Sequence, residues 1–195
     1  MDTPHEALAA DPYLGPLVDR HGELELKPCD DMFARLVVSV LRQQVSMAAA
    51  EATRERLFDA VEVTPEGILA ADPETLRECG LSRQKTEYAR NIAEAFGSGY
   101  DRAHFESLDD EAVIAELTEI KGVGEWTARM GLMFALGRPD VFAVGDLGIG
   151  KGMEAVFDEA MSREEMLDRA ERWAPYRSYA SLYLWRVEDG DAPSA

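Results

Sequence analysis

Residues 117–146, which read LTEIKGVGEWTARMGLMFALGRPDVFAVGD, constrain the fold of this chain more than any other stretch. Gly122 and Gly124 separate two runs whose apolar residues keep helical spacing. Those residues are Val113, Ile114, Leu117 and Ile120 before the glycines and Trp126, Met130, Met133 and Phe134 after them. Two helices therefore meet at a very tight turn, for which glycine supplies positive φ and room for another backbone.

This turn also predicts a ligand. The second helix begins there with its N–H groups and the positive end of its dipole exposed, so a phosphate is the natural ligand. A packed helical hairpin without any ligand gives the same pattern. The hairpin alone does not decide between the two interpretations.

Length and composition set the fold class. At 195 residues the chain is long enough for one well-buried core or for two small lobes that share an interface. No alternating pattern of useful length predicts a strand, so we expect an all-α protein. No apolar run is long enough to cross a bilayer, and the acidic N-terminus does not resemble a secretory signal, which favours a cytoplasmic protein. Cys29 and Cys79 form no CxxC motif and the histidines are scattered, so we expect reduced thiols and no metal site.

Several spaced motifs give the chain a family resemblance. Residues 120–128, IKGVGEWTA, resemble the hairpin of the helix-hairpin-helix DNA glycosylases. Residues 137–149, GRPDVFAVGDLGI, are similar to the Gly/Pro-rich loop, the catalytic aspartate and the helix start that follow in that superfamily. The runs RQQVS at 42–46, RWAPYRSYA at 172–180 and LWR at 184–186 resemble further segments of it. Together the motifs are most similar to the 3-methyladenine DNA glycosylase II family, over about residues 30–187.

The resemblance implies both a fold and an activity. The fold would be a two-lobed helical bundle with a helix-hairpin-helix motif at about 111–137, a catalytic loop at 138–146 and a cleft between the lobes, all in one domain of residues 1–195. The activity would be base-excision repair: a monomeric, nucleoid-associated enzyme flips an alkylated purine such as 3-methyladenine out of double-stranded DNA and hydrolyses its N-glycosidic bond. Two alternatives stay open, namely a glycosylase for uracil, hypoxanthine or an oxidised purine, and a hairpin protein that binds DNA without catalysis.

Asp146 is the candidate catalytic residue. Cleavage of an N-glycosidic bond gives the sugar oxocarbenium character, and a nearby carboxylate stabilises that charge and orients a water molecule. The family pattern assigns this role to Asp146, and its offset of 20 residues from Trp126 matches the family (146 − 126 = 20). An N-cap of the helix that starts at Leu147 is the other interpretation, and one aspartate can serve both purposes. Asp140 is the rival carboxylate, but it resembles a loop anchor.

The residue at position 126 predicts the reaction type. Relatives that also cut the DNA backbone carry a lysine in this slot, where it attacks the sugar. Trp126 is not a nucleophile, so the resemblance implies a monofunctional glycosylase that leaves an intact abasic site. Its electron-rich face would favour a positively charged alkylated purine by about 1 to 2 kcal/mol. Tyr176 and Tyr179 are further candidates for the base pocket, although core packing also explains their spacing.

The front of the chain supplies candidate DNA contacts. The apolar stripe of the helix that begins near Asp31 extends to Gln44, an amide that must find polar partners. Gln43 and Gln44 either end that helix through backbone contacts or face DNA, where the family places a wedge that fills the hole left by the flipped nucleotide. Ser46 caps the next helix. Arg83 and Lys85, in the first turn of a later helix, form either a solvated basic turn or a DNA contact.

The remaining candidate contacts lie at the hairpin and beyond Asp146. Hairpin phosphate contacts are expected from Lys121, Gly122, Val123, Gly124 and Thr127, and a further one from Lys151. Hairpins of this family often bind a monovalent cation through loop carbonyls. No other cofactor is expected.

The charge of the chain fits DNA binding only under particular conditions. A formal net charge of −18 argues against it, because phosphate contacts dominate that kind of affinity. An acidic surface with arginine in place of lysine is, however, similar to that of proteins from salt-loving cells, and a halophilic archaeon is the expected source. In molar salt the Debye length falls to about 3 Å, so distant carboxylates hardly repel DNA.

Overall fold

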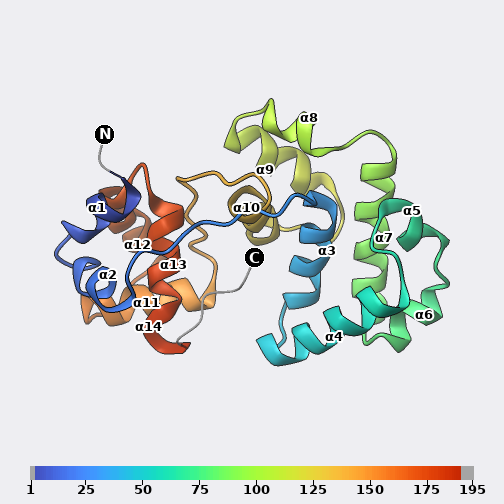
Figure 1. Cartoon of the computed structure of the whole chain (residues 1–195), viewed down its shortest axis with the longest axis horizontal. Helices are drawn as coiled ribbons and strands as arrows, with labels where there is room; N and C mark the ends of the chain where they lie inside the picture. Colours follow the sequence, from blue (N-terminus) through green and yellow to red (C-terminus); the bar gives the residue numbers. More distant parts are fainter. Residues whose placement is uncertain (1–2, 190–195) are drawn as a thin grey trace. The chain divides into compact units, whose positions relative to one another are not determined.

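The computed structural model describes residues 3–189, with side chains up to Val187. Every regular element in this range is a helix, which confirms the all-α prediction (Figure 1). The chain divides into two compact units. Unit 1 is formed by Met1–Pro28 and Gly137–Ala195, and unit 2 by Cys29–Leu136, so unit 2 is inserted into the sequence of unit 1. No helix within residues 3–189 has the length and apolar character needed to cross a membrane.

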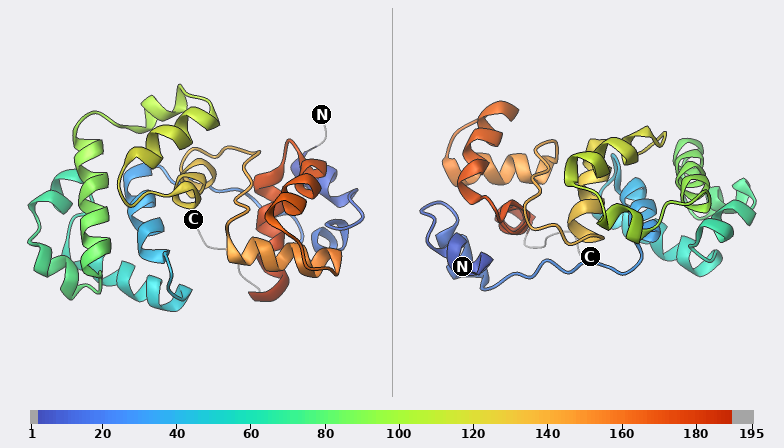
Figure 2. Two further views of the ribbon diagram at one scale, coloured as in Figure 1. Left: turned by 180° about the vertical axis from the view of Figure 1, so that it is seen from behind. Right: turned by 90° about the horizontal axis from the view of Figure 1, so that it is seen from above.

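Unit 2 is built around α3. Its helices are α3 (Met32–Arg42), α4 (Met47–Ala60), α5 (Pro65–Ala70), α6 (Pro73–Glu78), α7 (Arg83–Gly97), α8 (Arg102–Glu106), α9 (Asp110–Glu119) and α10 (Glu125–Phe134). Helix α3 packs against α7 on one side and α10 on the other, as all views in Figures 1 and 2 show. Helix α9 packs on α10, and α5 on α7. The predicted hairpin thus lies against the central helix of its unit.

The sequence explains why α3 occupies this place. Asp31 caps the helix by accepting a hydrogen bond from the N–H of Ala34 at 2.9 Å. Leu36, Val37 and Val40 then lie on its buried face and are fully inaccessible to solvent. The helix ends at Arg42, and its terminal turn receives a hydrogen bond from outside, because Lys85 Nζ donates to the carbonyl of Leu41 at 2.6 Å.

Unit 1 combines both ends of the chain. Its helices are α1 (Pro4–Ala9), α2 (Gly15–His21), α11 (Leu147–Phe157), α12 (Arg163–Ala170), the short 3₁₀ helix η1 (Glu171–Trp173), α13 (Arg177–Leu184) and α14 (Arg186–Asp189). Helix α11 packs on α13 and α14. Glycine makes this approach possible, because a Cβ on Gly148 would lie 2.7 Å from Trp185 Cδ1 and one on Gly152 2.5 Å from the carbonyl oxygen of Leu184.

The structure contains short helices that the periodicity did not predict. Helix α1 has too few residues to show a period, although Thr3 and Glu6 form a capping box that signals a helix start. Helix α8 is similarly short. Helix α12 is followed directly by the 3₁₀ helix η1, which begins at Glu171.

Candidate nucleic-acid interface and catalytic carboxylate

The hairpin joins α9 to α10 through residues 120–124. Gly122 adopts a φ of +105°, and a Cβ at this position would lie 2.1 Å from Cγ of Tyr88. Only glycine therefore fits, for conformational and for steric reasons. Gly124 is the N-cap of α10 and has no side chain with which to cap the helix. The start of α10 thus presents backbone N–H groups and the positive end of the helix dipole at the turn.

Gln43 holds the hairpin in place. Its Nε2 donates to the carbonyl of Gly122 at 3.1 Å and lies 3.0 Å from Thr127 Oγ1, which accepts a second hydrogen bond. Thr127 is only 1% exposed, so its side chain is not accessible for the predicted phosphate contact. The structure therefore shows a role for Gln43 that the sequence did not indicate: it ties the end of α3 to the hairpin.

Gln44 lies at an exposed tip of unit 2. It is one of two non-glycine residues with positive φ among those described, at +57°. Such a backbone is costly outside glycine and is retained mainly where the surrounding structure or a function requires it. Ser46 caps α4 by accepting from the N–H of Ala49 at 3.3 Å, as predicted, and Val45 and Met47 are 45% and 50% exposed. The apolar stripe of α3 does not continue to Gln44, because the helix ends first.

The predicted basic contacts of unit 2 have different environments. Lys121 is exposed at the hairpin and forms an ion pair with Glu87 at 2.5 Å; this hydrogen bond raises the pKa of Lys121. Lys85 is half-buried at the end of α3, and burial lowers its pKa. Its ammonium group binds a carbonyl inside the unit, a structural role that differs from both alternatives left open by the sequence, a solvated basic turn and a DNA contact. Arg83 is exposed on the same turn of α7.

Trp126 lies in the first turn of α10 and is half-buried. A tryptophan of the ordinary core would be buried as fully as Trp173, which is 2% exposed. Part of the Trp126 surface therefore remains accessible. Val123, in the hairpin, is 3% exposed, and its N–H donates to the carbonyl of Ile120 at 2.9 Å, so the structure does not support the predicted phosphate contact at this residue.

Asp146 is the N-cap of α11 in unit 1. Its Oδ1 accepts a hydrogen bond from the N–H of Ile149 at 3.0 Å and a second from Trp185 Nε1 at 2.8 Å. Trp185 is 7% exposed and comes from the far end of the sequence. The two bonds end on the same oxygen and hold the carboxylate at the start of α11. The N-cap interpretation of Asp146 is confirmed.

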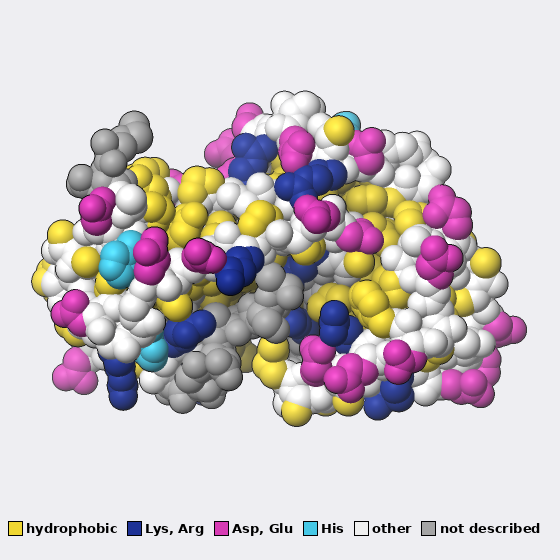
Figure 3. Space-filling model, viewed as in Figure 1, with side chains coloured by type: hydrophobic (Ala, Val, Ile, Leu, Met, Phe, Trp, Pro, Cys, Tyr) yellow, Lys and Arg dark blue, Asp and Glu magenta, His cyan; other side chains and the backbone are white. Residues whose placement is uncertain are grey.

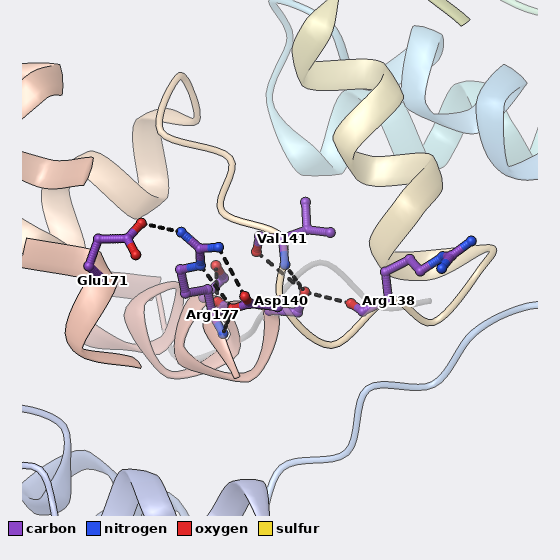
Figure 4. A network of polar contacts seen from close by, with 7 residues as sticks. Arg138, Asp140, Val141, Glu171 and Arg177 are labelled. Carbon is purple, nitrogen blue, oxygen red and sulfur yellow. Dashed lines mark hydrogen bonds and ion pairs between the residues drawn. The ribbon is translucent and has the colours of Figure 1, made fainter. Parts of the chain in front are cut away.

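The loop that leads to Asp146 is anchored by Asp140, shown in Figure 4, and by Ser178. Arg177 binds both oxygens of Asp140, from Nε at 2.8 Å and from Nη2 at 2.9 Å, and these hydrogen bonds raise the pKa of the arginine. Ser178 Oγ donates to the carbonyl of Arg138 at 2.7 Å and accepts from the N–H of Val141 at 2.9 Å. Asp140 is thus the loop anchor that the sequence indicated, and the start of α13 holds the loop.

The clamp between Arg177 and Asp140 gives a testable prediction. Lysine cannot reproduce the planar pair of hydrogen bonds, so Arg177→Lys is expected to lower the free energy of unfolding by about 1 to 2 kcal/mol. Urea denaturation measures the change. Arg54→Lys is the matched control, because Arg54 forms a single exposed ion pair with Glu51, worth less than about 1 kcal/mol. Equal losses in the two variants would contradict a specific clamp.

The other predicted residues of unit 1 lie on α11 and beside the start of α13. Lys151 is exposed on α11, one turn beyond Asp146. Tyr176 and Tyr179 are half-buried, and their rings meet edge to face with centroids 6.3 Å apart. Among residues 3–189, no group of three or more His, Cys, Asp or Glu side chains is arranged to hold a metal ion.

Comparisons with known proteins identify the family of this chain. Residues 37–175, which include parts of both units, match the HhH-GPD superfamily of base excision DNA repair proteins. The DNA-3-methyladenine glycosylase 1 of Schizosaccharomyces pombe is 36% identical over 164 residues, which are 80% of this chain and 72% of that protein. The DNA-3-methyladenine glycosylase 2 of Escherichia coli is 32% identical over 187 residues, 90% of this chain and 64% of that protein.

A solved structure shows the same fold. The Schizosaccharomyces pombe 3-methyladenine DNA glycosylase Mag1, in complex with abasic DNA, superposes with a TM-score of 0.86 at 32% identity and covers 94% of this chain and 95% of its own. The chain spans only about two thirds of several longer curated relatives, for example 64% of YfjP from Bacillus subtilis. By the match over residues 37–175, the chain belongs to the HhH-GPD superfamily of base excision DNA repair proteins.

Proposed function

We propose that this protein is a monofunctional DNA glycosylase that removes alkylated purines such as 3-methyladenine from double-stranded DNA. The observation that carries the proposal is the carboxylate of Asp146, held at the start of α11 by Ile149 and Trp185. Relatives that are at least 30% identical are named as DNA-3-methyladenine glycosylases, which supports the same base class.

In this proposal Asp146 stabilises charge on the sugar. As the N-glycosidic bond breaks, positive charge develops at C1′ and on the ring oxygen, and a fixed carboxylate stabilises it without reorganising. The same group orients the water molecule that attacks C1′. An alkylated purine carries positive charge and leaves as a neutral base, so no general acid is needed.

Trp126 sets the reaction type and contributes to base selection. Its indole cannot attack the sugar, so the enzyme leaves the abasic site intact. Its half-buried indole would attract a cationic base through a cation–π interaction, with Tyr176 and Tyr179 as further candidates for the base pocket. Extrusion of the nucleotide costs least where damage has weakened its pairing.

The DNA contacts in this proposal come mainly from the backbone. The N–H groups of Gly122 and Gly124 in the hairpin and those at the start of α10 bind phosphates, and Lys121 and Lys151 add charge. Gln44, on its exposed tip, fills the space left by the flipped nucleotide. A monovalent cation on the hairpin carbonyls and action as a monomer complete the proposal.

The activity is tested by incubating the protein with methylated DNA and identifying the bases released. Free 3-methyladenine or 7-methylguanine supports the proposal. Release of uracil, hypoxanthine or an oxidised purine from matching substrates would favour the second enzyme class, and binding without release a non-catalytic protein. Borohydride trapping tests the monofunctional mechanism, which a covalent adduct would contradict.

Replacing Trp185 tests how Asp146 is held. In Trp185→Phe the carboxylate loses the indole hydrogen bond, and base release is expected to fall about 10- to 100-fold, because misplacing a catalytic group is costly. Trp173→Phe is the matched control: Trp173 is equally large and buried, and its Nε1 has no hydrogen-bond partner among the described residues. An equal loss of activity in both variants would show that packing alone is responsible.

The salt dependence of stability tests the proposed halophilic origin. In Figure 3 acidic side chains are scattered over the visible face and do not form one patch. With a net charge of −18, mutual repulsion destabilises the folded state at low salt. The midpoint of thermal unfolding is therefore expected to rise by several degrees between low and molar KCl. A midpoint that is already maximal at low salt would contradict the proposal.

A further inference from the structure

A pocket of about 370 Å³ lies between α6 and α7 in unit 2. Its lining residues are Pro73, Arg77, Arg83, Thr86, Glu87 and Arg90. Arg83, Glu87 and Arg90 are spaced by four and three residues and so share one face of α7. In a chain with 20 basic and 38 acidic residues, three arginines around one pocket are a marked local concentration of positive charge.

Among the described residues, Arg77 is the only one of the three arginines with a carboxylate partner. Glu87 is paired with Lys121 of the hairpin, and Arg77 with Glu74 of its own helix. In the described part of the chain, no carboxylate lies within ion-pair distance of Arg83 or Arg90. Arg90 Nη1 donates to the carbonyls of Ile68 and Ala71, at 3.3 and 3.1 Å. These carbonyls are dipoles without a net charge, so they compensate only part of the positive charge of Arg90.

The hydroxyl of Thr86 is not available to donate a hydrogen bond to a ligand in the pocket. Its hydroxyl donates to the carbonyl of Ser82 at 3.1 Å, and the residue is 5% exposed. The free donors of the pocket are therefore guanidinium N–H groups. Their planar array suits an anion with several oxygens, such as a phosphate.

Side chains of α7 link the pocket to the hairpin. The carboxylate of Glu87 joins the pocket wall to Lys121, and Asn91 Nδ2 donates to the carbonyl of Lys121 at 2.9 Å. Tyr88, between them on α7, packs against Gly122. Arg83 lies four residues before Glu87, which is about 6 Å along the helix axis.

From this geometry we propose that Arg77, Arg83 and Arg90 bind a backbone phosphate of the DNA strand held by the hairpin. The inference rests on the proposed action on DNA and extends the predicted contact of Arg83 to a defined pocket. Arg83 supplies the exposed charge, Arg90 is fixed by its carbonyl partners, and Arg77 exchanges Glu74 for the phosphate. The hairpin and the pocket then bind one continuous stretch of the backbone.

The test is the salt dependence of DNA binding. Binding of a duplex with an abasic-site analogue is measured over a range of KCl concentrations for the wild type, Arg83→Ala and the double variant Arg77→Ala/Arg83→Ala. Arg83→Ala is expected to reduce the slope of log K against log[KCl] by about 0.9, the change for one lost phosphate contact. Arg20→Ala, an exposed arginine on α2 with the same change in charge, is expected to leave the slope unchanged.

A slope in Arg83→Ala equal to that of the wild type would overturn the proposal. The proposal would also be overturned if the pocket bound only small anions. In that case inorganic phosphate would stabilise the wild type against unfolding, but the slope of log K against log[KCl] would be the same in the variants. Arg83 has an exposed side chain and no ion pair in the described chain, so its replacement is not expected to prevent folding. Base release by the wild type is measured in parallel: its absence would overturn the proposed function, while a reduced slope would still support the pocket.

Discussion

Asp146→Asn is expected to lower the rate of base release by about 100- to 1,000-fold, the usual loss when a charge that stabilises a transition state is removed. The stability of the fold should change little, because asparagine is as good an N-cap as aspartate. The side-chain oxygen of asparagine can also accept the hydrogen bonds that Ile149 and Trp185 donate to Asp146. Base release from methylated DNA under single-turnover conditions measures the effect without interference from product release.

Asp140→Asn is the matched control for this variant. It removes one charge six residues away and breaks the pair with Arg177, so it is expected to lower stability by about 1 to 3 kcal/mol while the folded fraction retains most of its activity. Asp146→Asn should instead lose most of its activity while its stability changes little. If Asp146→Asn retained more than about a tenth of the wild-type rate, another group would have to stabilise the sugar.

Gly122→Ala is expected to have the largest effect on stability. A methyl group there would lie 2.1 Å from Cγ of Tyr88, and the backbone would have to keep a φ of +105° that alanine disfavours. Together these effects are expected to cost about 3 kcal/mol or more, or to force the hairpin into another conformation. Urea denaturation measures the loss of stability, and DNA binding measures the loss of the hairpin.

Gly124→Ala provides the control within the same turn. Gly124 has a φ of −90°, and nothing lies within 4 Å of a Cβ built on it, so the cost should stay below about 1 kcal/mol. Combining Gly122→Ala with Tyr88→Ala separates the two causes, since the double variant relieves the clash but keeps the strained backbone. Equal costs for Gly122→Ala and Gly124→Ala would show that the turn does not require glycine at position 122.

Helix starts could be predicted from the sequence. Asp31, Ser46, Thr64, Asp72, Ser82, Asp146 and Ser162 all cap helices in the structure, as their position before apolar or proline-led runs indicates. Each cap is a hydrogen bond to a backbone N–H two or three residues later, so the necessary information is contiguous in the chain. The hairpin was equally predictable, because its glycines and the two flanking stripes are local features.

The partners of the candidate site residues could not be predicted in this way. The sequence indicates only that Gln43 is a polar residue at a helix end, but its amide donates a hydrogen bond to the carbonyl of Gly122, 79 residues later in the chain. The sequence indicates only that Lys85 lies in a basic first turn of a helix, but its ammonium group donates a hydrogen bond to the carbonyl of Leu41 in the last turn of α3. The sequence around Trp185 is compatible with core packing or with the base pocket, and neither interpretation predicts its hydrogen bond to Asp146, 39 residues away.

The amino-acid sequence by itself determined the all-α class, the tight glycine turn and the place of Asp146 at a helix start, because these depend on interactions within a few residues. Only the tertiary structure decided which oxygen of Asp146 is held, which side chain fixes the hairpin and which arginines share a pocket. Those contacts depend on the packing of helices far apart in the chain, and periodicity shows which face of a helix is buried but not what it meets.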